Sequence, residues 1–411
     1  MSEQSMPQKI VIVGGGQAGG ETAAELRRKG FEGSITLIAD EAYVPYKRPP
    51  LSKAYLAGTA KLESLYVMAQ AALEKANIDL ISGVRAERID RAAKTVKLAD
   101  GREVGYDKLM LATGGRPREL SCPGADLPGI FTLRGIADVD AIREKFSEGK
   151  RLVIVGGGYI GLEVAAVAKK AGLEVTVLES MPRVLQRVTA PEMSAFYERV
   201  HREAGVEVRT GVLLTGFAQN GDALEVQVAG GSLPADLVIV GIGLIANTEL
   251  ASDAGLEVDN GIVVDEFART ADPDIYSAGD CTNHPSDFLG RRVRLESVQN
   301  AMEQGRVAAD NMLGATTPYA NVPWFWSDQY DLKLQMVGMS QGYDQVVLRG
   351  DPAGRSFGAF YLKQGQIIAA DMVSRMKEFM VAKKFVAAKL SLDPAALSDE
   401  SVDLKSLLPA D

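Results

Sequence analysis

Two glycine triplets with the spacing G-x-G-x-x-G each follow an apolar run. They are Gly14, Gly16 and Gly19, after residues 10–13, and Gly156, Gly158 and Gly161, after residues 152–155. The first glycine of such a motif permits a tight turn, the second lets a pyrophosphate approach the backbone, and the third lets a helix pack against the strand. The N-terminus of that helix attracts the phosphates. Two such sites predict a chain that holds two dinucleotides and passes electrons between them.

The residues that flank the two triplets also align. In each copy a helical stretch ends at a glycine, Gly30 or Gly172, and a β-branched run follows at residues 35–38 or 175–178. This order predicts a strand, a helix and a second strand in each copy. The expected fold class is therefore α/β, with two Rossmann-like dinucleotide-binding domains. Two Rossmann-like folds without ligands are the alternative.

Acidic residues follow the second strand of each copy. A carboxylate about 20 residues after the glycines commonly holds a ribose 2′-hydroxyl, and Glu179 has this position. Because it would repel a 2′-phosphate, Glu179 favours NADH over NADPH, although Arg183 and Arg187 follow closely. In the first copy Ala39 occupies the matching position, and we assign Asp40, which comes next, to the first ribose.

The composition limits the classes of function. The chain has 411 residues, of which 46% are hydrophobic and 24% charged, as in ordinary soluble proteins of two or three domains. Its net charge of −9 argues against general nucleic-acid binding. We find no apolar run of about 18 residues, the length of a membrane span. The polar residues 1–9 do not resemble a signal peptide, so we expect a cytoplasmic protein.

The cysteines and histidines do not suggest a redox or metal centre. Cys122 and Cys281 form no C-x-x-C pair, so we expect small core or near-core residues rather than a disulfide framework. His201 and His284 lack the spacing of metal ligands, and no metal site is predicted. The chemistry would then depend on bound cofactors.

The order of the elements predicts three domains. The first is discontinuous, at residues 1–112 and 244–322, because a later strand at 275–277 and the following Gly279 and Asp280 return to it. The second dinucleotide-binding domain covers residues 113–243. Residues 323–411 form an α+β C-terminal domain, with strands around 334–337, 345–349, 358–362 and 366–369, and helical segments at 374–388.

Four further motifs are specific to a known family. They are residues 46–53 (YKRPPLSK), 112–117 (ATGGRP), 275–280 (IYSAGD) and 323–329 (PWFWSDQ). With these motifs the whole chain resembles the flavoprotein pyridine-nucleotide reductases of the glutathione-reductase fold. More narrowly, it resembles the NADH-dependent ferredoxin reductases that serve bacterial oxygenases. The resemblance implies FAD in the first site and NADH in the second.

The resemblance also implies roles for individual residues. We expect FAD at Gly14, Gly16, Ala18, Gly19, Asp40, Lys53, Arg134, Gly279, Asp280, Val298 and Trp326, and NADH at Gly156, Gly158, Ile160, Gly161 and Glu179. The candidate catalytic residues, expected nearest the reacting rings, are Lys53, Glu163 and Trp326.

Each of these roles has a structural alternative. Lys53 would stabilise a reduced, anionic flavin, or is a surface lysine. Asp280 would bind the ribitol chain at a helix start, or is an N-cap. Glu163 would lie near the nicotinamide, or is a carboxylate favoured by the helix dipole; Glu21 has the matching place in the first copy. Core packing is the alternative for Trp326, and it is the role that we expect for Trp324.

A flavin would join two kinds of electron transfer. NADH gives two electrons as hydride, whereas a 2Fe–2S cluster accepts one at a time, and a flavin does both. The implied partner is an acidic 2Fe–2S ferredoxin and, indirectly, an oxygenase, for which we predict a haem monooxygenase. On a chain of net charge −9 such a partner needs a local basic face. Its candidate residues are Arg291, Arg292, Arg294, Arg306, Lys383 and Lys384.

Other functions of the same fold need features that we do not find. A disulfide reductase needs a cysteine pair in residues 43–53, and an NADH oxidase or peroxidase needs a single reactive cysteine there; this stretch has none. The apolar stretch 379–382 is too short to anchor a membrane quinone reductase. A rubredoxin reductase remains open. So does a flavoprotein whose redox state controls binding to a protein partner.

Overall fold

The computed structural model describes residues 7–221 and 223–409. The chain forms two compact units. The first comprises Met1–Arg48, Lys61–Arg116 and Leu244–Asn321, and the second Pro49–Ala60, Pro117–Gly243 and Val322–Asp411. Residues 49–60 thus group with the second unit, although we predicted them in the first domain. The three functional domains and their boundaries stay a prediction.

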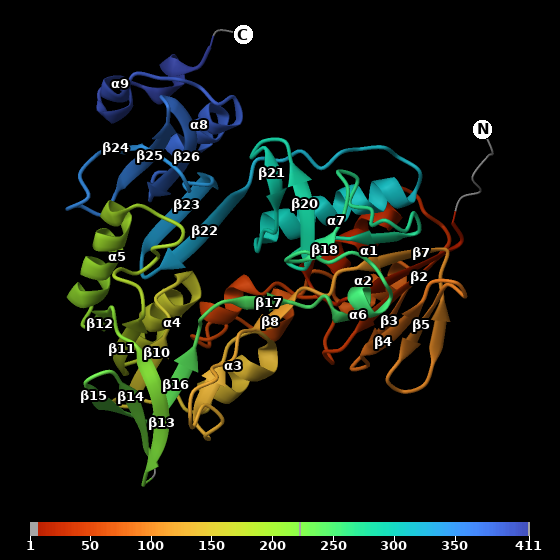
Figure 1. The fold of residues 1–411 in the computed structure, drawn as a ribbon, viewed down its shortest axis with the longest axis horizontal. Helices are drawn as coiled ribbons and strands as arrows, with labels where there is room; N and C mark the ends of the chain where they lie inside the picture. Colours follow the sequence, from red (N-terminus) through yellow and green to blue (C-terminus); the bar gives the residue numbers. More distant parts are fainter. Residues whose placement is uncertain (1–6, 222, 410–411) are drawn as a thin grey trace. The chain divides into compact units, whose positions relative to one another are not determined.

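The first unit is built on a parallel sheet with the strand order β19-β7-β1-β2-β3. Its strands are β1 (Lys9–Val13), β2 (Ser34–Ala39), β3 (Ile78–Ser82), β7 (Lys108–Leu111) and β19 (Ile275–Ser277). β19 pairs with β7, so the late strand returns to the first dinucleotide-binding sheet, as predicted. Strands β7, β2 and β3 of this sheet are labelled in Figure 1.

Both faces of this sheet are covered, which explains why β1 is apolar throughout. Ile10 and Ile12 pack with Leu26 on one face, where helices α1 (Gln17–Arg28) and α7 (Val298–Met312) contact each other. Val11 packs in the core on the opposite face, which includes residues of the antiparallel sheet β4-β5-β6. Successive side chains of a strand point to opposite faces, so a strand buried on both sides reads as a continuous apolar run.

The remaining elements of the first unit are short. They are α2 (Gln70–Lys75), β4 (Ala86–Asp90), β5 (Thr95–Leu98), β6 (Glu103–Gly105), β8 (Gly115–Pro117), β17 (Leu244–Ala246), α6 (Glu249–Asp253), β18 (Ile262–Val263), β20 (Thr282–Ser286) and β21 (Arg291–Val293), with a 3₁₀ turn at Leu62–Leu65. β8 pairs with β17, so the chain leaves and re-enters this unit along adjacent strands.

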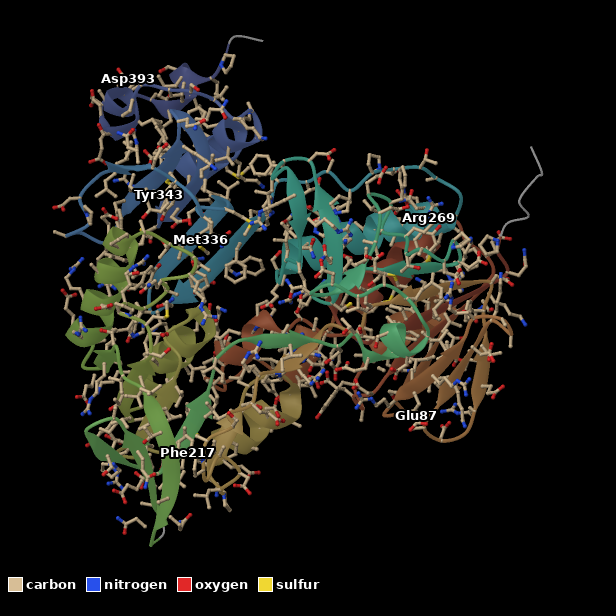
Figure 2. The ribbon with its side chains drawn as sticks, in the orientation of Figure 1. Glu87, Phe217, Arg269, Met336, Tyr343 and Asp393 are labelled. Carbon is tan, nitrogen blue, oxygen red and sulfur yellow. The ribbon has the colours of Figure 1, made fainter. Side chains whose placement is uncertain are left out.

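The second unit repeats the parallel architecture with the order β12-β11-β10-β16-β9. Its elements are β9 (Ile130–Thr132), α3 (Ile136–Arg143), β10 (Arg151–Val155), α4 (Tyr159–Lys170), β11 (Glu174–Glu179), α5 (Pro191–Glu203), β12 (Glu207–Thr210) and β16 (Leu237–Val240), with the antiparallel strands β13 (Leu214–Asn220), β14 (Ala223–Val228) and β15 (Gly231–Ala235). Phe217 of β13, labelled in Figure 2, packs in the core with Val155 and Val240. The second copy of the motif thus has the same strand–helix–strand frame as the first.

The second unit also contains the C-terminal antiparallel sheet, of order β22-β23-β26-β25-β24. Its strands are β22 (Trp324–Gln329), β23 (Leu332–Gly338), β24 (Gln345–Arg349), β25 (Phe357–Lys363) and β26 (Gln366–Val373), and helix α8 (Met376–Ala387) packs on β26 and β23. Helix α9 (Pro394–Ser398) and a 3₁₀ turn (Leu404–Leu407) follow. Among the described helices, none is long and apolar enough to cross a membrane.

A buried arginine attaches the last residues to this sheet. Arg349 on β24 is 2% exposed. It donates to the Glu378 carboxylate at 2.9 Å and to the carbonyl oxygens of Leu397 at 3.2 Å and Val402 at 2.9 Å. Since a guanidinium presents donors in several directions, one side chain satisfies α8 and the segment around α9 together.

We predict that Arg349→Leu lowers the free energy of unfolding by about 3–5 kcal/mol, because it leaves the carbonyl oxygens of Leu397, Asp399 and Val402 without their donor and removes one of the two arginine partners of Glu378. Arg355→Leu is the matched control. Arg355 pairs with Asp331 while 45% exposed, so its loss costs at most about 1 kcal/mol. Urea unfolding of both variants measures the difference, and equal effects would contradict the anchoring role.

Candidate functional site

The first glycine of each triplet has a backbone that other residues rarely adopt. The φ angles of Gly14 and Gly156 are 124° and 114°. A Cβ atom on Gly14 would lie 2.1 Å from the carbonyl oxygen of Ala112, and one on Gly156 would lie 2.3 Å from that of Gly241. In both copies the turn therefore passes directly against the end of the neighbouring strand.

The second and third glycines of each triplet differ in their surroundings: the third is crowded and the second is open. A Cβ atom on Gly19 would meet the Gly14 oxygen at 2.0 Å, and one on Gly161 the Gly156 oxygen at 2.2 Å. A Cβ atom on Gly16 or Gly158, in contrast, would meet no described atom within 4 Å beyond its own chain neighbours and helix. These second glycines leave open space in front of the N-termini of α1 and α4. Both turns thus fit the pyrophosphate of a dinucleotide.

The strand registers settle which residues correspond in the two copies. Val13 is opposite Ile38, and Val155 is opposite Leu178, so Ala39 and Glu179 occupy equivalent positions, as the sequence predicts. The Glu179 carboxylate accepts hydrogen bonds from the N–H groups of Gly157 and Met181, both at 2.8 Å. Backbone donors therefore hold this carboxylate beside the second glycine turn.

Arg183, a possible partner of a 2′-phosphate, is engaged within its own segment. It donates to the Ser194 hydroxyl at 2.6 Å and to the Gln186 carbonyl oxygen at 3.2 Å. In the first copy Asp40 is exposed at the end of β2. The adjacent Glu41 accepts from the Tyr46 hydroxyl and, at 2.6 Å, from Arg48. The assignment of Asp40 to a ribose stays a prediction.

Glu163 is the centre of a buried polar cluster in the second unit. It lies on α4 just after Gly161 and is 3% exposed. Its Oε2 accepts from the Ser52 hydroxyl at 2.5 Å and from Lys53 Nζ at 2.6 Å, and its Oε1 accepts from the Ser327 hydroxyl at 2.7 Å. The Lys53 side chain is 20% exposed. Lys53 is thus paired with a buried carboxylate and is not a free surface lysine.

Ser52 and Ser327 are site residues that we did not predict. They are 111 and 164 positions from Glu163 in the chain, so neither local spacing nor periodicity connects them to it. A signal did exist, because each serine lies inside a motif that carries the family resemblance, residues 46–53 and 323–329.

The tryptophans of β22 lie side by side. The ring centroids of Trp324 and Trp326 are 5.6 Å apart, and both residues are partly exposed. Lys383 lies over the Trp324 ring, 5.0 Å from its centroid. Our expectation that Trp324 only packs in the core is therefore incomplete, because its ring is partly exposed on the same surface as Trp326.

Several predicted FAD residues meet in the first unit. A Cβ atom on Gly279 would lie 3.1 Å from Cβ of Ala18, so the returning chain passes directly against α1. Asp280 lies in the turn between β19 and β20, so the prediction that it begins a helix is wrong. The nearby helix α7 begins at Val298, and its N-cap is Ser297, which accepts from the N–H of Asn300.

The second unit contains the other predicted cofactor residues. Arg134 lies two positions before the start of α3, and its N–H donates to Asp138 at 2.9 Å. Ile160 is 50% exposed although it is apolar, and it adjoins the open space at Gly158. Tyr159, before it, donates to the sulfur of Met336 at 2.7 Å (Met336 is labelled in Figure 2).

Three of the arginines proposed for docking have internal partners. Arg306 donates to Glu21 at 3.0 Å, Arg294 pairs with Glu296 at 2.7 Å, and Arg292 donates to the Val264 carbonyl oxygen at 2.6 Å. Their positive charge is thus partly used within the first unit. Arg291 on β21 and Lys384 on α8 are exposed. The docking role of all six basic residues stays a proposal.

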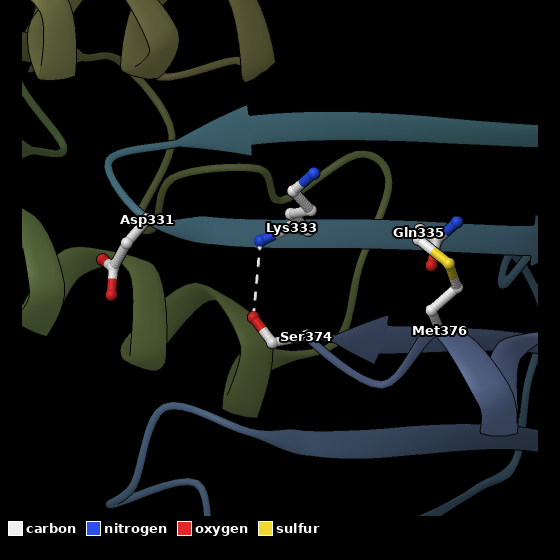
Figure 3. A pocket seen from close by; sticks show the side chains of 5 residues that line it. All are labelled: Asp331, Lys333, Gln335, Ser374 and Met376. Carbon is white, nitrogen blue, oxygen red and sulfur yellow. Dashed lines mark hydrogen bonds between the residues drawn. The ribbon is translucent and has the colours of Figure 1, made fainter.

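Figure 3 shows a pocket of about 270 Å³ in the second unit. Its lining residues are Asp331, Lys333, Gln335, Ser374 and Met376. The Lys333 N–H donates to the Ser374 hydroxyl at 3.5 Å across it. Since none of these described lining residues belongs to the glycine turns or to the Glu163 cluster, the pocket is separate from the predicted sites.

Comparison with known proteins decides the family. The model of the pyridine nucleotide-disulphide oxidoreductases matches residues 8–305, and that of the reductase C-terminal domain matches residues 324–408. The chain belongs to the pyridine nucleotide-disulphide oxidoreductase family. The predicted fold class and the prediction of an oxidoreductase are confirmed.

Individual relatives agree over nearly the full length. Putidaredoxin reductase CamA of Pseudomonas putida is 48% identical over 98% of this chain and 97% of its own length. The structure of a covalent putidaredoxin reductase–putidaredoxin complex superposes with a TM-score of 0.95, at 48% identity and 98% coverage of both chains. That of the ferredoxin reductase for the CYP199A2 system of Rhodopseudomonas palustris has a TM-score of 0.94, at 42% identity, covering 97% and 99%.

The contrast between the second and third glycines yields a prediction. Gly158→Ala places its methyl group in open space, so the fold is retained, but the methyl group occupies the space of the pyrophosphate and raises KM for NADH about tenfold, equivalent to about 1.4 kcal/mol. Gly161→Ala instead forces a methyl group against the Gly156 oxygen and lowers the free energy of unfolding by about 1–3 kcal/mol.

Steady-state kinetics and thermal unfolding of both variants test this division. An unchanged KM in a folded Gly158→Ala protein would show that this turn does not face the phosphates.

Proposed function

We propose that this protein is an FAD-dependent NADH:ferredoxin reductase, which passes single electrons to a 2Fe–2S ferredoxin that serves an oxygenase. The observation that carries the proposal is the pair of glycine turns with matching geometry in one chain, each open in front of a helix N-terminus. The relatives named as ferredoxin or putidaredoxin reductases support the acceptor. The terminal oxygenase we propose is a haem monooxygenase.

FAD, when bound, supplies the step that converts one hydride into two single electrons. In our proposal the turn of Gly14, Gly16 and Gly19 binds its pyrophosphate, and Ala18 and Gly279 border it. The corresponding turn of α4 binds NADH, and Glu179 accepts from a ribose hydroxyl. The support for NADH over NADPH is that the acidic residue Glu179 occupies this position, while Arg183 donates within its own segment.

The Glu163 cluster is the basis on which we propose roles for the residues near the reacting rings. Lys53 carries the positive charge that favours a reduced flavin, and Glu163 holds its ammonium group at 2.6 Å. Because Glu163 is two residues from the last glycine of the NADH turn, it connects the position of Lys53 to the bound nicotinamide dinucleotide. Trp326 covers the rings from the C-terminal sheet in this proposal.

We further propose a cytoplasmic location. NADH is regenerated there, and the two cysteines of the chain are both free thiols in the described structure, as expected for a reducing compartment.

Anaerobic titration with NADH tests the function. The purified protein should be yellow, and NADH should bleach it at about one equivalent per FAD. Addition of a 2Fe–2S ferredoxin should then restore the colour as electrons leave. Faster restoration with a rubredoxin would favour the rubredoxin reductase. Bleaching without turnover in either case would favour a redox-dependent binding protein, and a colourless protein that cannot be reconstituted with FAD would overturn the proposal.

Substitution of Lys384 is the best test of the docking face, because this lysine is exposed. Arg306 is less suitable, because it pairs with Glu21 inside the first unit. We predict that Lys384→Glu raises KM for the ferredoxin several-fold at low salt, and that the effect shrinks as ionic strength rises. Lys97→Glu, an exposed position on β5 of the first unit, is the matched control for net charge.

Reduction of a small dye by NADH should be the same in both variants. A loss of dye reduction in Lys384→Glu, or an equal change in KM for the ferredoxin in Lys97→Glu, would contradict docking at Lys384.

A further inference from the structure

The Glu163 cluster continues into the interior of the second unit through Ser327. The Ser327 hydroxyl oxygen lies 3.2 Å from Gln329 Nε2, and Gln329 Oε1 lies 2.9 Å from His201 Nε2. The other ring nitrogen of His201 lies 3.0 Å from the Tyr330 hydroxyl. An unbroken series of hydrogen bonds thus joins β22 and α5 to the carboxylate on α4.

Almost all of this series is removed from water. Ser327 and His201 are 0% exposed, Gln329 is 1% exposed and Glu163 is 3% exposed. Only Tyr330, at the turn after β22, is partly exposed. Polar groups at such depth destabilise the fold unless each has a partner. Each polar group in this series has a hydrogen-bond partner, so the series is a satisfied hydrogen-bond network in the interior.

The chemistry of the groups allows one direction of donation. A carboxylate can only accept, so the Ser327 hydroxyl donates to Glu163 and receives its own hydrogen bond from the Gln329 NH₂ group. The Gln329 carbonyl oxygen then faces His201, whose Nε2 must carry the proton. In a neutral ring Nδ1 accepts, and Tyr330 therefore donates to it. Burial lowers the pKa of His201 to about 4, which keeps the ring neutral.

This direction indicates what the series transmits. An amide neither loses nor gains a proton readily near neutral pH, so Gln329 interrupts any passage of protons. The series instead fixes the orientation of its side chains. Each donor holds the acceptor of the next residue in place, and hydrogen bonds in series strengthen one another.

We propose that His201 and Gln329 are positioning residues for NADH oxidation, which act through Ser327 to hold the Glu163 carboxylate in the orientation that retains Lys53. This inference rests on the proposed function. Ser327 fixes Oε1 of Glu163, and the opposite oxygen is thereby left facing Ser52 and Lys53. Loss of the series would let the carboxylate rotate and would release the ammonium group from its partner.

Paired variants separate positioning from packing. His201→Leu removes the donor to Gln329, whereas His201→Gln keeps an N–H near the Nε2 position. Gln329→Glu preserves the shape but replaces the donor by an acceptor, which draws the Ser327 proton away from Glu163. Val200→Ala, also on α5 and 2% exposed, is the control for a general loss of packing.

We expect His201→Leu and Gln329→Glu to slow flavin reduction at saturating NADH about tenfold with little change in the half-saturating NADH concentration, because the loss lies in the transition state rather than in binding. His201→Gln should restore most of the rate. The flavin midpoint potential should shift toward that of Glu163→Gln in the first two variants and remain unchanged in Val200→Ala.

A double-mutant cycle with Glu163→Gln gives the decisive result. If His201 acts through Glu163, adding His201→Leu to Glu163→Gln changes neither the reduction rate nor the potential further. Additive effects, or equal defects in His201→Leu and His201→Gln, would overturn the inference. Wild-type protein that NADH bleaches and that a 2Fe–2S ferredoxin then reoxidises shows, alongside these variants, that the proposed function itself stands.

Discussion

The burial of one carboxylate, Glu163, constrains three segments of the second unit that are far apart in the sequence. An ionised group removed from water costs several kcal/mol unless partners replace the lost hydration. Its described partners are Ser52 in a 3₁₀ turn at Pro49–Ser52, Lys53 directly after this turn, and Ser327 on the first strand of the C-terminal sheet. These segments can satisfy the charge only when all of them are folded together. The position of Lys53 and the course of β22 are therefore linked to one carboxylate on α4.

The two glycine turns illustrate how one local solution serves two sites. Gly14 and Gly156 share a left-handed backbone conformation. Gly19 and Gly161 both lie close to the carbonyl oxygen of the first glycine of their triplet. The copies diverge at the position that we propose for contact with the ribose. Glu179 and Ala39 are equivalent positions, yet only the second copy has a carboxylate there. The acid after the third glycine also differs in its partner, which is Arg306 for Glu21 and Lys53 for Glu163.

Three of the arginines proposed for docking have partners within the first unit. Arg292, Arg294 and Arg306 each neutralise or satisfy groups of their own unit, so a count of basic residues in the sequence overstates the positive surface. An acidic partner would meet the charge that remains exposed. For an enzyme of net charge −9, such a face decides the orientation of an encounter, because like charges elsewhere repel the partner.

The sequence by itself determined the elements whose causes are local. Glycine spacing, apolar runs and β-branched segments predicted both dinucleotide turns, the strand–helix–strand order around them and the return of residues 275–277, since each depends on backbone geometry and on the periodicity of neighbouring side chains. The motifs around Lys53 and Trp326 indicated the family in another way, through their resemblance to known reductases.

Only the tertiary structure decided which distant side chains share a charge or a hydrogen bond. Ser52, Ser327, Gln329 and His201 have no periodic relation to Glu163, and any of them is an ordinary core or surface residue when considered alone. We expected Asp280 at a helix start because the family resemblance implied one, but the chain turns there into β20. Hydrogen bonds between distant residues depend on which buried polar groups the whole fold brings together. Neighbouring residues in the sequence do not reveal these partners.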